Sequence, residues 1–277
     1  MSKRVAVVSA LVEGNSLRST CRMTGVAMNT VLKLLAELGD ACATFHQEQV
    51  RNVNAKRIQC DEIWQFVYAK ARNVPEDKQG TFGYGDVWTW TAIDPDTKLI
   101  VSYLIGPRRP SMAFELMTDV ASRLAGKVQL TTDGLYWYPH AVEQAFGIDV
   151  DYAVLQKHYG QGSPSGQSRY SPARLTGISR EVIRGNPDER HISTSIIERQ
   201  NLTMRMSMRR FTRLTNGFSK KLENHAHAVA IHFFHYNFCR IHKSLRVTPA
   251  IESGLSDHVW SLEEMIGLLD RHSAVAA

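Results

Sequence analysis

Hydrophobic and polar residues along residues 56–107 follow the pattern of β-strands. Aromatic and β-branched residues are enriched in segments 56–70, 87–94 and 99–107, and a polar turn at 94–98 separates the last two. Residues 111–126 then place apolar side chains at helical spacing. A short apolar strand at 128–134, a helix at 140–147 and a strand at 150–160 follow. The pattern predicts three strands followed by helix, strand, helix and strand.

Residues 16–44 predict two helices joined by a turn at Gly25, with the second helix running from about Met28 to Leu38. This arrangement resembles a helix-turn-helix, in which the second helix enters the major groove of DNA. The side chains that would face the DNA are Asn29, Thr30 and Lys33. An ordinary helical hairpin is the alternative interpretation.

Residues 160–192 are rich in Gly, Ser and Pro in their first half, which predicts a long inserted loop. Further helices are predicted from Ser195 onward, from about Ser219 to Phe238, and over residues 261–272. The chain is therefore expected to have three parts. Residues 1–50 form a small all-α helix-turn-helix domain, residues 51–255 form an α/β domain that contains the loop, and residues 256–277 form a C-terminal helix.

The composition is that of a folded globular protein, because 43% of residues are hydrophobic and 22% are charged. The formal net charge is +6. Between residues 199 and 221 there are seven basic residues and no acidic one, which favours a polyanionic partner. These residues are Arg199, Arg205, Arg209, Arg210, Arg213, Lys220 and Lys221.

The four cysteines form no Cys-x-x-Cys pair, which excludes a zinc ribbon and favours reduced thiols inside a cell. No run of apolar residues approaches the length of about 18 that a membrane span needs. No small-residue cleavage site follows the short apolar run near the N-terminus. The expected location is the cytoplasm, with no membrane partner.

Four motifs resemble the catalytic core of DDE transposases and retroviral-type integrases. They are Asp-Glu-Ile-Trp at 61–64, Thr-Thr-Asp-Gly at 131–134, and the segments 195–205 and 236–250. Together with Gln-Lys-His-Tyr at 156–159, they most resemble the bacterial insertion-sequence-one family, over about residues 56–250. The resemblance implies a ribonuclease-H-like fold, a five-stranded mixed sheet with helices on both faces, and makes residues 51–255 the DDE catalytic domain.

The same resemblance assigns three carboxylates, Asp61, Asp133 and Glu198, as catalytic residues and metal ligands. Phosphodiester chemistry of this kind uses two Mg²⁺ ions about 3.5 to 4 Å apart, for which Mn²⁺ is expected to substitute. Such hard cations take carboxylate oxygens as ligands. Because Glu62 follows Asp61 in a strand and points to the opposite face, only one of these two is expected to enter a given site.

Each carboxylate also has a structural interpretation. Asp61 fits a solvated strand edge, and Asp133 before Gly134 fits turn chemistry. Glu198, three residues after Ser195, fits a helix capping box.

The stretch between Asp133 and Glu198 is longer than in compact members of the family, and the family's N-terminal zinc-binding part is missing. A helix-turn-helix would then have to recognise the DNA ends.

The resemblance further implies DNA contacts. Arg205, seven residues after Glu198, matches a basic position that lies near the cleaved phosphate, and Lys157 matches a basic position of the family. Asn201 shares the helical face of Glu198. Arg199, Arg209, Arg210 and Arg213 would extend a track of phosphate contacts. A solvated helix surface is the alternative for each of these residues.

The sequence therefore predicts a DNA transposase that cleaves the ends of an insertion sequence and transfers the strands into target DNA. Its partners would be DNA and at least one further copy of itself, and it would act at the bacterial nucleoid. Two alternatives remain open: a metal-dependent nuclease of the same fold, and a non-catalytic DNA-binding regulator.

Overall fold

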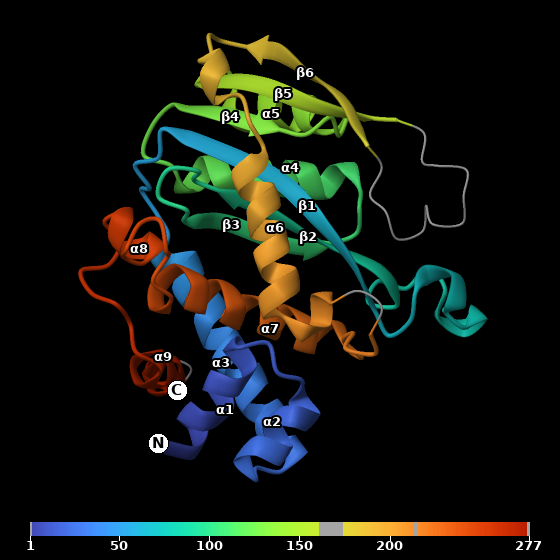
Figure 1. Ribbon diagram of the computed structural model, residues 1–277, viewed down its shortest axis with the longest axis vertical. Helices are drawn as coiled ribbons and strands as arrows, with labels where there is room; N and C mark the ends of the chain where they lie inside the picture. Colours follow the sequence, from blue (N-terminus) through green and yellow to red (C-terminus); the bar gives the residue numbers. More distant parts are fainter. Residues whose placement is uncertain (1, 161–173, 213–214, 276–277) are drawn as a thin grey trace.

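The centre of the molecule is a six-stranded mixed sheet (Figure 1). The computed structural model describes residues 2–160, 174–212 and 215–275. The strands lie in the order β3-β2-β1-β4-β5-β6, with β1 pairing antiparallel to β2 and parallel to β4. Their bounds are β1 Arg57–Val67, β2 Gly85–Ile93, β3 Ile100–Gly106, β4 Val128–Thr132, β5 Val150–Tyr159 and β6 Leu175–Arg184. The predicted order of the first five strands and of the two helices between them is confirmed.

The strand β6 corrects the prediction of five strands and of a loop through 160–192. It pairs antiparallel with β5, for example Lys157 with Ile178. Most of its side chains are exposed, so the strand lacks the buried, alternating apolar positions by which the others were predicted. Residues 161–173 of the predicted loop lie outside the described residues.

Helices cover both faces of the sheet (Figure 1). On one face, α4 (Pro110–Arg123) and α5 (Tyr138–Phe146) pack on a cluster that includes Ile58, Cys60 and Trp90. On the other face, α6 (Ser195–Ser207) and α7 (Leu222–Phe234) pack on Ile63 and Ile93. After α7 the chain continues with the π-helical turn His235–Cys239, α8 (Pro249–Glu252) and α9 (Leu262–Val275). Short 3₁₀ turns lie at Ala71–Asn73, Glu76–Lys78, Glu189–His191 and Arg209–Phe211.

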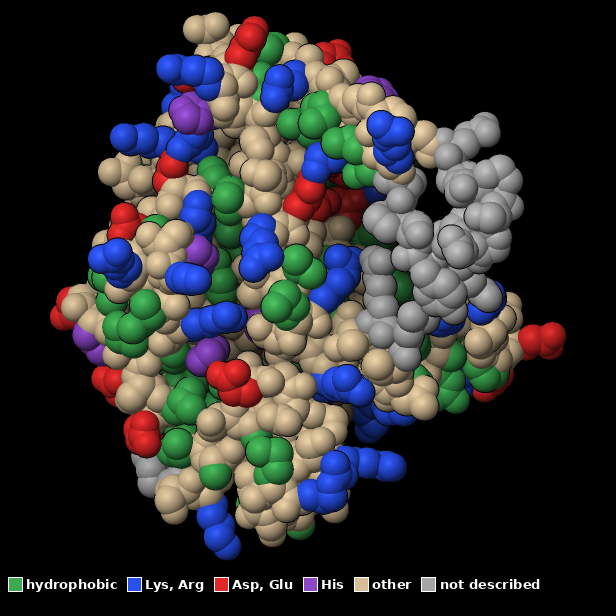
Figure 2. All heavy atoms as spheres, viewed as in Figure 1, with side chains coloured by type: hydrophobic (Ala, Val, Ile, Leu, Met, Phe, Trp, Pro, Cys, Tyr) green, Lys and Arg blue, Asp and Glu red, His purple; other side chains and the backbone are tan. Residues whose placement is uncertain are grey.

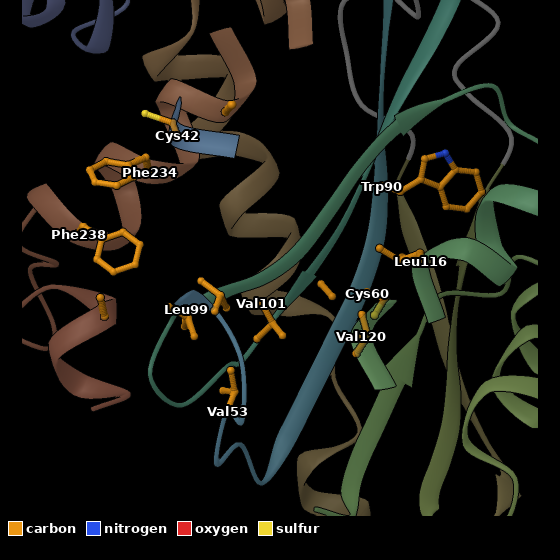
Figure 3. Packing of buried hydrophobic residues seen from close by; sticks show 14 of the residues in the cluster. Cys42, Val53, Cys60, Trp90, Leu99, Val101, Leu116, Val120, Phe234 and Phe238 are labelled. Carbon is orange, nitrogen blue, oxygen red and sulfur yellow. The ribbon is translucent and has the colours of Figure 1, made fainter. Parts of the chain in front are cut away.

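The N-terminal part contains α1 (Ser2–Val12), α2 (Leu17–Thr24) and α3 (Met28–Gln49). Gly25, at φ +67°, ends α2, as the turn prediction requires. The second helix runs to Gln49 and does not stop at Leu38, because its buried stripe continues through Ala41, Cys42 and His46 onto α7. Figure 3 shows the side chains of Cys42 and Phe234 in this packing. The buried cluster of α1 and α3 is thus continuous with that of the sheet.

Within residues 2–160, 174–212 and 215–275, none of the helices combines the length and the hydrophobicity that a membrane span requires.

The helices α3 and α7 approach each other closely at Gly39. A Cβ placed there would lie 2.4 Å from the Cβ and 2.6 Å from the Cα of His227. Beside it, the Nε2 of His227 and the Oδ1 of Asp40 are 3.0 Å apart. The backbone of α7 occupies the space that any larger side chain would need, so this crossing depends on glycine.

We expect Gly39→Ala to lower the free energy of unfolding by about 1–3 kcal/mol, because the added methyl group must push the two helices apart. The matched control is Gly267→Ala in α9, where an added Cβ meets no atom within 4 Å. The control should raise stability by up to about 1 kcal/mol through helix propensity. Urea unfolding measures both, and equal effects of the two variants would contradict the close helix crossing.

Candidate active site

The parallel strands β1 and β4 separate at a defined point in the middle of the sheet. Their pairing ends at Cys60 and Thr132. The next residue of each chain segment is an aspartate, Asp61 on β1 and Asp133 directly after β4. Parallel neighbours end at the same edge, so these two carboxylates lie at one opening of the sheet.

Asp61 points toward α6. Its Oδ2 accepts a hydrogen bond of 2.8 Å from the Nδ2 of Asn201, and its Oδ1 accepts one of 2.8 Å from the backbone N–H of Glu62. The Oδ1 of Asp133 accepts from the backbone N–H of Leu135 at 3.0 Å. The turn chemistry considered for Asp133 is therefore present, and it coexists with a place in a carboxylate cluster.

Glu62 belongs to the same cluster. Ligand oxygens of Asp61, Glu62 and Asp133 all lie within 4.8 Å of one another. The expectation that only one of the two neighbours Asp61 and Glu62 enters a site is wrong. The reason is that the β1–β4 ladder has ended, so side chains from both faces of β1 can reach the same opening.

Glu62 is held by a cation from another element. Its Oε1 accepts from the Nε and Nη2 of Arg108 at 2.9 and 2.6 Å, and its Oε2 accepts from the hydroxyl of Tyr138 at 3.2 Å. The guanidinium of Arg108 also lies 4.8 Å from the centre of the Trp88 ring. No sequence pattern indicates these contacts, because they join β1 to the segment just before α4 and to α5 across long stretches of chain.

Glu198 lies beside this cluster, on α6, without being one of its three members. One of its oxygens accepts from the Nζ of Lys157 at 2.5 Å and from the Oγ1 of Thr194 at 2.7 Å. Its negative charge contributes to raising the pKa of both Asp61 and Asp133. The capping box with Ser195 is absent, because Thr194 is the N-cap and makes no side-chain cap bond.

The surroundings of the cluster disfavour the ionised form of its carboxyl groups. Burial, with added repulsion from Asp133 and Glu62, raises the pKa of Asp61 to about 8. Burial also raises the pKa of Asp133 and that of Glu62, and the positive charge of Arg108 opposes the rise at both residues. Within the described ranges, Glu62 and Glu198 have ion-pair partners, whereas Asp61 and Asp133 have none. Two half-buried carboxylates without an ion-pair partner suit a hard divalent cation, whose preferred ligands are oxygens.

The predicted DNA contacts near the cluster occupy different surroundings. Asn201 is buried and its amide donates to Asp61, and Lys157 is paired with Glu198. Arg199 is exposed and Arg205 is half-buried, both on α6.

The other predicted DNA contacts lie farther along the chain. Arg209 is exposed, whereas Arg210 is half-buried and donates to the Oγ of Ser219 at 2.8 Å. Arg213 lies outside the described residues. On α3 the three predicted residues are all exposed: Asn29, Thr30 and Lys33.

The space-filling view shows acidic side chains in a hollow of this face, with basic side chains around it (Figure 2). Figure 1 places α6 across β1 on the same side. The chain thus brings a group of carboxylates to an accessible surface next to basic residues.

No protein-family model matches the chain, and no curated protein matches it. Among solved structures, the chain is similar to a piggyBac transposase synaptic complex with hairpin DNA, with a TM-score of 0.43 and 11% identity over 96% of this chain and 68% of that one. It is also similar to the Mos1 strand transfer complex, with a TM-score of 0.25 and 10% identity over 52% of this chain. The chain spans 56% of the length of the Mos1 chain. At identities this low, the function has to be inferred from the site itself.

The raised pKa of Asp61 predicts how stability depends on pH when no divalent cation is present. The folded state keeps a proton on Asp61 that the unfolded state, with an ordinary pKa of 3.8, has already released. The folded protein therefore loses stability as the pH rises through about 8. Between pH 6 and 9, we expect a loss of about 1–3 kcal/mol in the free energy of unfolding.

Urea unfolding in EDTA at several pH values measures this slope. Asp61→Asn should flatten it, and Asp149→Asn, at an exposed carboxylate outside the cluster, should leave it as in the wild type. A wild-type protein whose stability is constant or rises from pH 6 to 9 would contradict the raised pKa of Asp61.

Proposed function

We propose that this protein is a DNA transposase of the DDE type, which cleaves DNA at the ends of an insertion sequence and joins the freed ends to target DNA. One observation carries the proposal: two carboxylates without a cationic partner, Asp61 and Asp133, meet where adjacent parallel strands separate, and a third acid, Glu198, lies beside them on a helix. We further propose that β1 to β5 and their helices form a ribonuclease-H-like core.

The residues present fit a divalent metal site. Asp61 and Asp133 would hold Mg²⁺ or Mn²⁺, with Glu198 and Glu62 as the nearest further oxygen donors. A pair of such ions would supply charge compensation, an activated attacking oxygen and stabilisation of the leaving oxygen.

Residues around the cluster fix the orientation of these acids. Asn201 donates to one oxygen of Asp61 while a backbone N–H donates to the other, so this carboxylate has a defined direction. Lys157 holds Glu198, and Arg108 holds Glu62. Lys157 and Arg108 would both lie next to a phosphate bound at this site. Each is suited to contact that phosphate once the carboxylate that it now pairs with binds a metal ion.

The DNA would extend from this site over basic residues. Arg199 directly follows Glu198 on α6, Arg205 lies seven residues after Glu198 on the same helix, and Arg209 begins the 3₁₀ turn that comes after it. The pair α2 and α3 would recognise the DNA ends through Asn29, Thr30 and Lys33. Because a transposase must bring two ends together, we propose that it acts as a dimer or larger assembly, at the nucleoid of a bacterial cell.

The test is to incubate the purified chain with a DNA fragment that holds its own gene and both flanks, in Mg²⁺ or Mn²⁺. We expect cuts at defined ends and joined products. Asp133→Asn and Glu198→Gln should each reduce both by about 100-fold or more, because each removes a negatively charged oxygen ligand. Sequencing gel analysis of the products measures position and extent.

Asp149→Asn is the matched control, since it neutralises an exposed acid outside the cluster and should leave cleavage unchanged. Cutting without any joined product would replace the proposal with a metal-dependent nuclease. Binding without cutting by the wild type would replace it with a DNA-binding regulator. Full activity of Asp133→Asn would refute the assignment of the site.

Metal binding can be measured apart from catalysis. Millimolar Mn²⁺ should raise the melting temperature of the wild type by about 2–5 °C, because a ligand of the folded state alone stabilises it. The rise should disappear in Asp61→Asn and in Asp133→Asn, and should persist in Asp149→Asn. Calorimetry with and without EDTA checks this, and an equal rise in all four proteins would show that the cation binds elsewhere.

A further inference from the structure

A pocket of about 780 Å³ lies between the N-terminal helices and the segment that connects α6 to α7. Its walls come from α1, α2 and α3 on one side and from residues 207–210, 216–221 and α7 on the other. None of the carboxylates of the candidate active site lines it. It is a second concave site, within the range of about 300–1,000 Å³ that is usual for small-molecule pockets.

The charged residues that line this pocket are all basic. They are Arg18, Arg209, Arg210, Lys220 and Lys221. No ion pair between described residues involves any of them. Four of the five are exposed, which puts their positive charge at the mouth of the pocket.

The fifth cation, Arg210, is half-buried. Burial lowers the pKa of its guanidinium to about 10, and one of its N–H groups donates to the Oγ of Ser219 at 2.8 Å. The neighbouring His225 is neutral, because burial first and Arg210 second lower its pKa to about 3. A desolvated cation without an acidic partner is costly, and an anion in the pocket would offset that cost.

The deeper wall is apolar. Leu35, Met208 and Ile231 are each less than 7% exposed, and they line the pocket together with His232. The Nε2 of His232 has no hydrogen-bond partner among the described residues. Burial lowers the pKa of His232 to about 3, so the ring is neutral. This wall suits a flat, largely apolar group that carries a few polar atoms.

We propose that this pocket binds a nucleotide, with its phosphate on the cations of the mouth and its base against the apolar wall. A free nucleoside phosphate and an unpaired nucleotide of a DNA strand share this chemistry. The site differs from the predicted DNA-reading surface of α3, because the pocket is lined by Met28, Leu32 and Leu35 and not by Asn29, Thr30 or Lys33. It requires neither the carboxylate cluster nor a metal.

The test is calorimetric titration of the full chain in EDTA with ADP, with pyrophosphate, with a short thymidine oligonucleotide and with an abasic oligonucleotide of equal length. A ligand with bases should bind at least about tenfold more tightly than its base-free counterpart, because only the former uses the apolar wall. Saturable binding of ADP identifies a free nucleoside phosphate as the ligand of the pocket. Saturation by the thymidine oligonucleotide alone identifies a DNA strand.

Two variants test the basic mouth and the apolar wall of the pocket independently. Lys221→Glu should lower the affinity for every ligand by about tenfold or more, since it reverses a charge at the mouth. Ala228→Leu narrows the pocket without changing its charge, and should lower the affinity only for the ligands that carry bases. Far-ultraviolet circular dichroism and melting curves verify that both variants are folded.

The matched control is Lys243→Glu, which reverses an exposed charge outside the pocket and should change affinity less than twofold. Asp133→Asn should bind as the wild type does, so the result is independent of the proposed transposase activity. Equal affinity for ligands with and without bases would overturn the proposal. So would an equal loss in Lys243→Glu and Lys221→Glu, because binding would then follow the net charge of the surface.

Discussion

The parallel pairing of β1 with β4, and the point where it stops, is the constraint on which the candidate site depends. While the ladder continues, neighbouring residues of β1 point to opposite faces of the sheet and cannot share a ligand. After Cys60 and Thr132 the ladder is open, and Asp61, Glu62 and Asp133 converge there.

The acids around the opening divide into two kinds. Glu62 forms an ion pair with Arg108, which lies just before α4, and Glu198 forms one with Lys157 of β5. Asp61 and Asp133 have only neutral hydrogen-bond donors, so burial raises the pKa of both. This difference identifies where positive charge is missing. The absence of an ion-pair partner at Asp61 and Asp133 is also the reason for proposing a divalent cation at these two residues.

The helices behind the site connect it with the rest of the chain. The side chain of Asn237 makes hydrogen bonds with both the N–H and the C=O of Ile100, so the segment after α7 is fixed to β3. Gln65 near the end of β1 contacts His225 of α7 at 2.6 Å, and Ser219 lies between His225 and Arg210. The strand that carries Asp61 is thereby joined to the basic segment that lines the second pocket. The two sites are consequently connected through β1 and α7.

The amino-acid sequence by itself determined the order of the first five strands and their helices, because alternation and helical spacing are local properties of consecutive residues. It also placed Asp61 within the first strand and Asp133 at the end of the fourth. The tertiary structure decided the rest. It added β6, whose exposed side chains carry no periodic signal, and it brought Glu62 into the cluster. It paired Glu198 with Lys157, 41 residues away, and Asn201 with Asp61, 140 residues away. Contacts over such separations depend on where strands end and on how helices cross, and no local pattern of residues encodes either.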